Sequence, residues 1–170
     1  MSFGPGPLSP ALLALIGANV AFFLAQFLFP SLLGINLDWT LGLHPRQVLS
    51  QFAVWQLVSY MFLHAGISHI LFNMLALWMF GTELERMWGT RYFLKFYFTT
   101  GIGAGLLTVV FSLLPFSFAR HVWGANIVGA SGAIFGLLLA YAMSLPAATD
   151  VSLFPLPGRD ALRRDDLRRD

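Results

Sequence analysis

Four long apolar stretches divide the chain, and prolines or charged residues separate them. Each stretch is close to the ~20 apolar residues that an α-helix needs to cross a bilayer. Proline follows three of them, and proline ends or interrupts helices. The pattern predicts an all-α fold, a polytopic membrane helical bundle of about four transmembrane helices, over residues 8–29, 67–88, 92–114 and 127–145.

The pattern also predicts a simple domain organisation. Residues 1–148 are expected to form one transmembrane domain, and residues 149–170 a polar cytoplasmic tail in which Arg alternates with Asp. The first ten residues contain no Lys or Arg, so we expect no cleavable signal peptide and a first helix that stays in the membrane.

Composition agrees with a membrane environment. Hydrophobic residues make up 57% of the chain and charged residues 11%, against about 25% charged in soluble domains. The absence of cysteine excludes disulfides, thiol catalysis and cysteine metal sites. Basic residues outside the tail are scattered, which argues against a nucleic-acid partner and leaves the lipid bilayer as the expected surroundings.

The distribution of Lys and Arg predicts the orientation. Four spans place Arg86, Arg91, Lys95 and the tail arginines on one side, and Arg46 and Arg120 on the other. The positive-inside rule then puts both termini in the cytoplasm, in what we expect to be a bacterial inner membrane. Residues 31–66 would face outward. They are rich in aromatic residues, which predicts an element lying in the membrane interface.

Polar side chains inside the spans are costly and are candidates for function. His69 and Asn73 lie four residues apart, on one face of the second span. Ser131 lies early in the fourth span, between Gly129-Ala130 and Gly132. Because both spans run inward, we expect the three side chains at similar depth in one outward-facing pocket. A hydroxyl beside amide, imidazole and backbone N–H donors suits acyl transfer.

Simpler interpretations remain open for each of these residues. Ser131 and the pair Gly132 and Gly136 could serve helix packing, and His69 with Asn73 could form an interhelical hydrogen-bond pair. His64, His44 and His121 could be interfacial residues. We interpret the three glycines of the third span as packing residues, namely Gly101, Gly103 and Gly105. We interpret Glu83, Glu85 and Arg86 as a solvated helix end.

The order and spacing of these motifs resemble the rhomboid family of intramembrane serine proteases. The run from His64 through His69 to Asn73 is similar to the family's second-helix signature, and Gly129-Ala130-Ser131-Gly132 to its nucleophile motif. The resemblance implies Ser131 as nucleophile, an oxyanion site from His69, Asn73 and the Ser131 backbone, and a polar pocket that includes His64 and Gly129. It implies transmembrane proteins as substrates, with neither metal nor cofactor.

This sequence departs from the family's pattern at the general base. In rhomboids it is a histidine on a later helix, whereas none of the 39 residues after Ser131 is histidine. His121, in the loop before the fourth span, is a weak candidate substitute. We therefore expect little activity from this chain alone. Three interpretations stay open: a truncated or frameshifted gene, a non-catalytic relative that binds membrane-helix clients, and an enzyme completed by self-association or by another chain.

Overall fold

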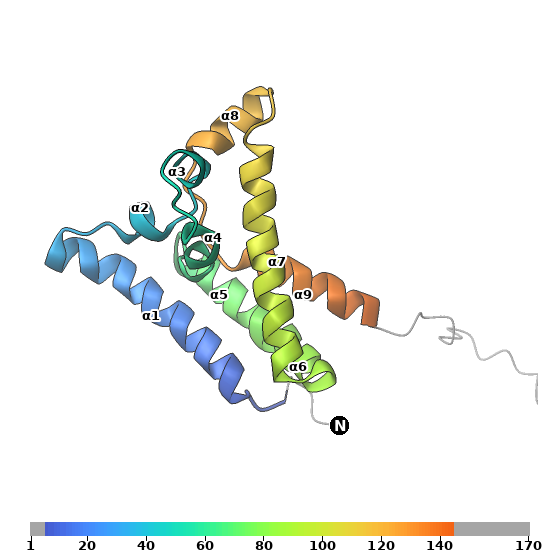
Figure 1. The fold of residues 1–170 in the computed structure, drawn as a ribbon. Coiled ribbons are helices and arrows are strands. Elements are labelled where there is room, and N and C mark those ends of the chain that lie inside the picture. The colour runs from blue at the N-terminus through green and yellow to red at the C-terminus, as the bar shows by residue number, and fades with distance from the viewer. Residues whose placement is uncertain (1–5, 145–170) are drawn as a thin grey trace, which may run out of the picture.

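The structure is a computed structural model that describes residues 6–144, and these residues form a helical bundle (Figure 1). The elements in chain order are α1 (Pro10–Leu33), α2 (Leu37–Leu41), α3 (Pro45–Ser50), α4 (Gln56–Ser59), η1 (Tyr60–Phe62), α5 (Ile67–Ala76), η2 (Leu77–Gly81), α6 (Thr82–Trp88), α7 (Thr90–Phe111), α8 (Ser117–Gly124) and α9 (Ser131–Ser144).

The first long helix begins at a proline and continues through another. The Ser9 hydroxyl accepts a hydrogen bond from the Leu12 N–H at 3.1 Å, which caps α1 behind Pro10. The expectation that Pro30 ends this helix is wrong, because α1 continues to Leu33. Proline already has a helical φ and removes only one hydrogen bond so close to a helix end. Gly34, at φ 67°, ends the helix in the left-handed conformation.

The second long helix is continuous from Ile67 to Trp88 but contains one π turn, η2, between α5 and α6. At Gly81, at the end of that turn, a Cβ would lie 2.9 Å from Leu12 Cδ2, so α1 approaches the backbone closely there.

Within the described residues, α1, the α5–α6 helix and α7 are long and apolar enough to span a membrane, and α9 is a shorter apolar helix. The chain is therefore a polytopic helical membrane protein.

The fourth apolar stretch is only partly helical. We expected helix from about Ile127, but α9 begins at Ser131. Ile127 instead forms an isolated antiparallel bridge with Leu43, with N···O distances of 2.9 and 3.0 Å. A backbone that gives its hydrogen bonds to Leu43 cannot also use them in a helix, so the expected boundary was four residues early.

Glycines bring α7 and α9 into close contact. A Cβ at Gly132 would lie 2.6 Å from Ala104 Cβ, and one at Gly136 would lie 2.7 Å from Thr100 Cβ. At Gly101 the Met61 side chain fills the space where a Cβ would stand. The packing interpretation holds for these three glycines, as small residues let membrane helices approach. It is wrong for Gly103, which has no neighbour within 4 Å of its Cβ position in the described part of the chain.

Residues 35–66, which the sequence predicts to face outward and which we call the outer segment, fold into three short helices and η1 around a buried polar group. The His44 N–H donates to Gln56 Oε1 at 3.0 Å, and Gln56 Nε2 donates to Gln47 Oε1 at 2.6 Å. His44 is buried against the Trp39 ring, at a centroid distance of 4.9 Å, so its interpretation as an interfacial residue is wrong. Burial lowers the pKa of His44.

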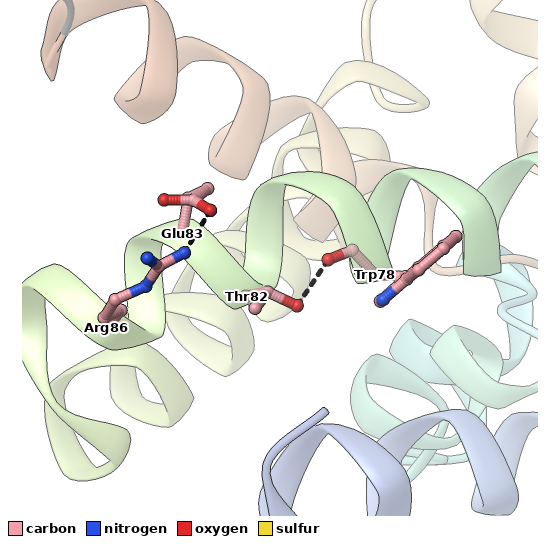
Figure 2. A network of polar contacts seen from close by, with 4 residues as sticks. All are labelled: Trp78, Thr82, Glu83 and Arg86. Atoms are coloured by element: carbon pink, nitrogen blue, oxygen red, sulfur yellow. Dashed lines mark hydrogen bonds and ion pairs between the residues drawn. The ribbon is translucent and has the colours of Figure 1, made fainter. Parts of the chain in front are cut away.

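The turn between α6 and α7 contains a buried carboxylate. Glu85 accepts hydrogen bonds from the Ser9 hydroxyl at 2.5 Å and from the Thr90 hydroxyl at 2.6 Å, and it is 6% exposed. Its interpretation as part of a solvated helix end is therefore wrong. Glu83 does fit that interpretation, because it pairs with Arg86 on the outside of α6 (Figure 2).

The glycine contact predicts a difference between two otherwise similar substitutions. Gly136→Ala should destabilise the bundle by about 1–3 kcal/mol, because the added methyl overpacks the α7–α9 contact. Gly103→Ala, in open space on α7, should be neutral or stabilising, since alanine favours helix by about 1 kcal/mol over glycine. Thermal unfolding in detergent measures both, and equal midpoints would contradict the packing.

The two glutamates of α6 provide a second matched pair. Glu85→Ala should cost about 1–3 kcal/mol, because it leaves two hydroxyl donors without their acceptor. Glu83→Ala should change stability by less than about 0.5 kcal/mol, as an exposed ion pair contributes little. Chemical denaturation of the two variants in the same detergent separates them, and an equal loss in both would refute the buried role of Glu85.

Candidate functional site

Ser131, His69 and Asn73 line one cleft between α5 and α9. Ser131 follows His69 by 62 residues and Asn73 by 58 residues in the sequence, so the fold brings these side chains together. The cleft has a volume of about 310 Å³. Its remaining lining is mainly apolar and comes from both helices, namely Ser68, Phe72, Ile134, Phe135 and Leu138. The structure thus brings together the three side chains that the sequence placed at similar depth.

Ser131 is the first residue of α9 rather than an interior one. The first backbone N–H groups of a helix have no partner within the helix, and they give its N-terminus a partial positive charge. The first i to i−4 bond around this end runs from the Ile134 N–H to the Ala130 carbonyl, at 3.0 Å. The Ser131 hydroxyl therefore stands beside backbone donors that can receive a developing negative charge.

The His69 ring has a defined tautomer in its neutral form. Its Nδ1 accepts the Ala65 N–H at 3.3 Å, so the ring proton is on Nε2. The ring lies against Gly129, where a Cβ would be 2.7 Å from His69 Cε1 and 2.8 Å from Nε2. Gly129 also has φ 121°, which favours glycine. His69 thus presents a donor, not a base, beside the residues that lead into Ser131.

Asn73 is held on the same helical face as His69. Its Nδ2 donates to the His69 carbonyl at 3.0 Å, and the residue is 6% exposed. An amide nitrogen carries two hydrogens, so one donor remains after this bond. The alternative of an interhelical hydrogen bond is not found among the described residues, because the Asn73 side chain bonds within α5 and the His69 ring bonds to Ala65, just before α5.

His64 lies just before α5, buried behind His69. The two rings are 5.1 Å apart between centroids, and His64 is 2% exposed, so its interpretation as an interfacial residue is wrong. Gln26 of α1 fixes the His64 backbone, accepting its N–H at 2.9 Å and donating to its carbonyl at 3.2 Å. Both His64 ring nitrogens are buried without a partner among the described residues. Burial, and secondarily the His69 charge, lower the pKa of His64 to about 4.

His121 is not brought to the cleft. It lies exposed on α8, with Nδ1 2.8 Å from the Ser117 carbonyl. Figure 1 shows α8 at the C-terminal end of α7, away from the body of α9. Of the four histidines in the sequence, all within the described residues, His69 alone lines the cleft. Residues 6–144 also contain no group of three His, Asp or Glu side chains placed to hold a metal ion.

Tyr60 of η1 is a site residue that the sequence did not indicate. Its carbonyl accepts the Gly129 N–H at 2.9 Å, and its hydroxyl donates to the Gly101 carbonyl at 2.7 Å. Burial raises the pKa of Tyr60 to about 12, so the hydroxyl stays a neutral donor. Tyrosine in an aromatic-rich outer segment carries no motif of its own, and only the folded contact identifies it.

The buried His64 predicts a specific pH dependence of stability. Its folded pKa of about 4 lies below the unfolded value of 6.5, so the unfolded chain binds the extra proton and stability falls as pH drops from 6.5 to 4. The contribution is at most about 3 kcal/mol. His64→Leu should flatten thermal midpoints over this window relative to His121→Gln. A slope that His64→Leu leaves unchanged would assign the dependence to other groups.

Comparison with known proteins gives a consistent result. The family model described as the Rhomboid domain matches residues 51–159. The chain is 40% identical over 97 residues to "Rhomboid protease GluP" of Bacillus subtilis, covering 57% of this chain and 17% of that protein. It is 34% identical over 146 residues to "Rhomboid protein 1, mitochondrial" of Saccharomyces cerevisiae, covering 85% of this chain and 40% of that protein.

A third relative, "Putative rhomboid protease YdcA" of Bacillus subtilis, is 41% identical over 87 residues, which cover 51% of this chain and 39% of that protein. The chain thus matches less than half the length of each of these curated relatives. The family model covers well over half of the chain, including the residues from His64 to Ser131 that form the cleft. The chain belongs to the rhomboid family.

Proposed function

We propose that this chain provides the nucleophile and the oxyanion donors of a rhomboid-type intramembrane serine endopeptidase. The observation that carries the proposal is the shared cleft, in which Ser131 at a helix N-terminus faces the same space as His69 and Asn73. Ser131 Oγ would attack a substrate carbonyl carbon. The carbonyl oxygen would gain negative charge and accept hydrogen bonds from the Ser131 N–H, His69 Nε2–H and Asn73 Nδ2.

The general base of this reaction is not among the four histidines of a single copy of the chain. His69 has its Nδ1 occupied by Ala65 and its proton on Nε2, and the other three do not line the cleft. A serine without its histidine loses on the order of 10⁶ in rate. We therefore infer that the base comes either from a second copy of this chain or from a polypeptide segment outside residues 1–170, and that one copy of residues 1–170 is nearly inactive by itself.

Substrates follow from the position of the cleft in a membrane bundle. Phe72 and Phe135 at its edges are 68% and 71% exposed, which suits contact with an apolar helix in lipid. We propose transmembrane segments of other proteins as substrates, cut near their outer ends. Figure 1 shows α6, the helix that contains Arg86, at one end of the bundle, and α3 and α8, the helices that contain Arg46 and Arg120, at the other. By the positive-inside rule, this supports cytoplasmic termini and an outward-facing site, and we propose a bacterial inner membrane as the location.

A second candidate function is that of a non-catalytic, client-binding relative. The same exposed Phe72 and Phe135 favour it, because they would contact a membrane helix whether or not Ser131 reacts. Photo-crosslinkers at Phe135 and, as a control, at the equally exposed Leu107 on α7 separate this function from catalysis. A non-catalytic binding protein would crosslink membrane proteins from Phe135 but not from Leu107, and the unsubstituted Ser131 would not react with a serine-directed probe.

Labelling by a fluorophosphonate probe tests the catalytic proposal directly. The chain in lipid should label slowly, and free imidazole should accelerate labelling, because it can take the serine proton in place of the absent base. Ser131→Ala should abolish labelling, whereas Ser144→Ala, at the other end of α9, should not change it. His69→Ala should slow the imidazole-assisted reaction by about 10²–10³, the usual effect of one lost oxyanion donor.

Mass spectrometry of the labelled peptide verifies the residue. Labelling that is absent even with imidazole, in a sample whose thermal midpoint shows that it is folded, would overturn the proposed nucleophile. Labelling that His69→Ala leaves unchanged would remove His69 from the oxyanion site while keeping Ser131.

A further inference from the structure

The outer segment contacts the backbone just before Ser131 at two points. At the first point, Leu43 and Ile127 exchange two backbone hydrogen bonds, the Leu43 N–H to the Ile127 carbonyl at 2.9 Å and the Ile127 N–H to the Leu43 carbonyl at 3.0 Å. At the second point, the Gly129 N–H donates to the Tyr60 carbonyl at 2.9 Å. The amides two and four residues before Ser131 are therefore bound to the outer segment and not to α9.

Steric contacts leave this connection little freedom. A Cβ at Gly42 would lie 2.1 Å from Asn126 Oδ1 and 2.4 Å from the Asp38 carbonyl oxygen, so only glycine fits beside Asn126. On the other side, Gly129 lies against the His69 ring. The extended backbone from Asn126 to Gly129 is thus held between the outer segment and α5.

Tyr60 extends the contact to the far side of Ser131. It is 4% exposed, and its hydroxyl lies 3.3 Å from the place of a Cβ on Gly132 while it donates to the Gly101 carbonyl of α7. One residue of the outer segment therefore contacts the chain two residues before Ser131 and one residue after it. The side chain of Met61, next in sequence, occupies the space where a Cβ on Gly101 would stand, so η1 packs against the contact between α7 and α9.

We propose that the outer segment regulates the reactivity of Ser131, and that Gly42 and Tyr60 are its positioning residues. The segment sets the backbone from Ile127 to Gly129 and so the direction of the first N–H groups of α9. Displacing it would turn the oxyanion donors away from the cleft with the helices still packed. The side chains of Trp39, Phe52 and Trp55 are 65%, 78% and 52% exposed, so the surrounding lipid can contact this segment directly. This inference rests on the proposed function of Ser131.

Gly42→Ala tests the first contact, with Gly124→Ala as a matched control on α8, where no neighbour of the described chain lies within 4 Å of the Cβ position. Tyr60→Phe tests the contact that the Tyr60 hydroxyl makes with the Gly101 carbonyl beside Gly132, since it removes only this hydroxyl and leaves the backbone bond between Gly129 and Tyr60 in place. Two quantities are measured in the 170-residue chain in lipid nanodiscs. One is hydrogen exchange of the Ile127 and Gly129 amides, with α7 amides as a measure of global unfolding. The other is imidazole-assisted fluorophosphonate labelling of Ser131.

Gly42→Ala should raise exchange at Ile127 and Gly129, leave α7 exchange unchanged, and slow labelling about 10- to 100-fold, the cost of a misplacement near 1 Å. Tyr60→Phe should slow labelling by a smaller factor, and Gly124→Ala should match the wild type in both quantities. Faster exchange with unchanged labelling would overturn the regulatory role. Unchanged exchange in Gly42→Ala would overturn the contact itself.

The same data separate this inference from the proposed function. If wild-type Ser131 does not label even with imidazole, the proposed function fails and regulation of its reactivity fails with it. Exchange at Gly129 then still shows whether the outer segment holds this backbone. If the wild type labels and all three variants label at the wild-type rate, only the inference fails.

Discussion

The close contact between α7 and α9 is the interaction on which the rest of the structure depends. In lipid, no hydrophobic driving force holds two apolar helices together, so their association relies on close packing and hydrogen bonds. Gly132 and Gly136 permit that packing on α9, and Gly101 on α7 accepts Met61 of the outer segment. Ser131 immediately precedes Gly132. The same contact that binds the helices therefore also places the proposed nucleophile at the end of a fixed helix.

Buried polar groups add a second constraint, because each one needs a partner away from water. Some of the partners come from far away in sequence: the buried Glu85 accepts from the Ser9 hydroxyl, 76 residues earlier, and the half-buried Gln26 bonds to the His64 backbone. These bonds tie α1 to both ends of the α5–α6 helix. Four side chains of the described residues have buried polar atoms without a partner, namely Asn19, His44, His64 and Tyr97. Of these, the His64 ring packs against the ring of His69, where a polar group without a partner costs stability but keeps the surroundings of His69 polar.

Sequence periodicity was enough to predict part of the site. His69 and Asn73 share a face because they are four residues apart on a helix, and apolar length alone indicated the membrane bundle. The start of α9 was not predictable in this way. Ile127 and Val128 are as apolar as the helix that follows, and only pairing with Leu43, remote in sequence, makes that stretch extended. Glu85, Tyr60 and His44 were misjudged or missed for the same reason, since their partners come from other elements.

The division of roles within the cleft follows from the protonation of a single ring. Because Ala65 donates to His69 Nδ1, the neutral ring can only donate through Nε2 toward the cleft. A donor stabilises an oxyanion but cannot accept the serine proton, so the described half of the site is suited to receiving negative charge. A base must then reach Ser131 from a direction that α5 does not occupy. The exposed edge of α9 at Phe135 and Leu139 is open to such a contact in the described bundle, and it is also the edge where an apolar client helix would lie. Under the proposed function, the base and the substrate helix would share this edge, so the element that supplies the base would also restrict how a substrate reaches Ser131.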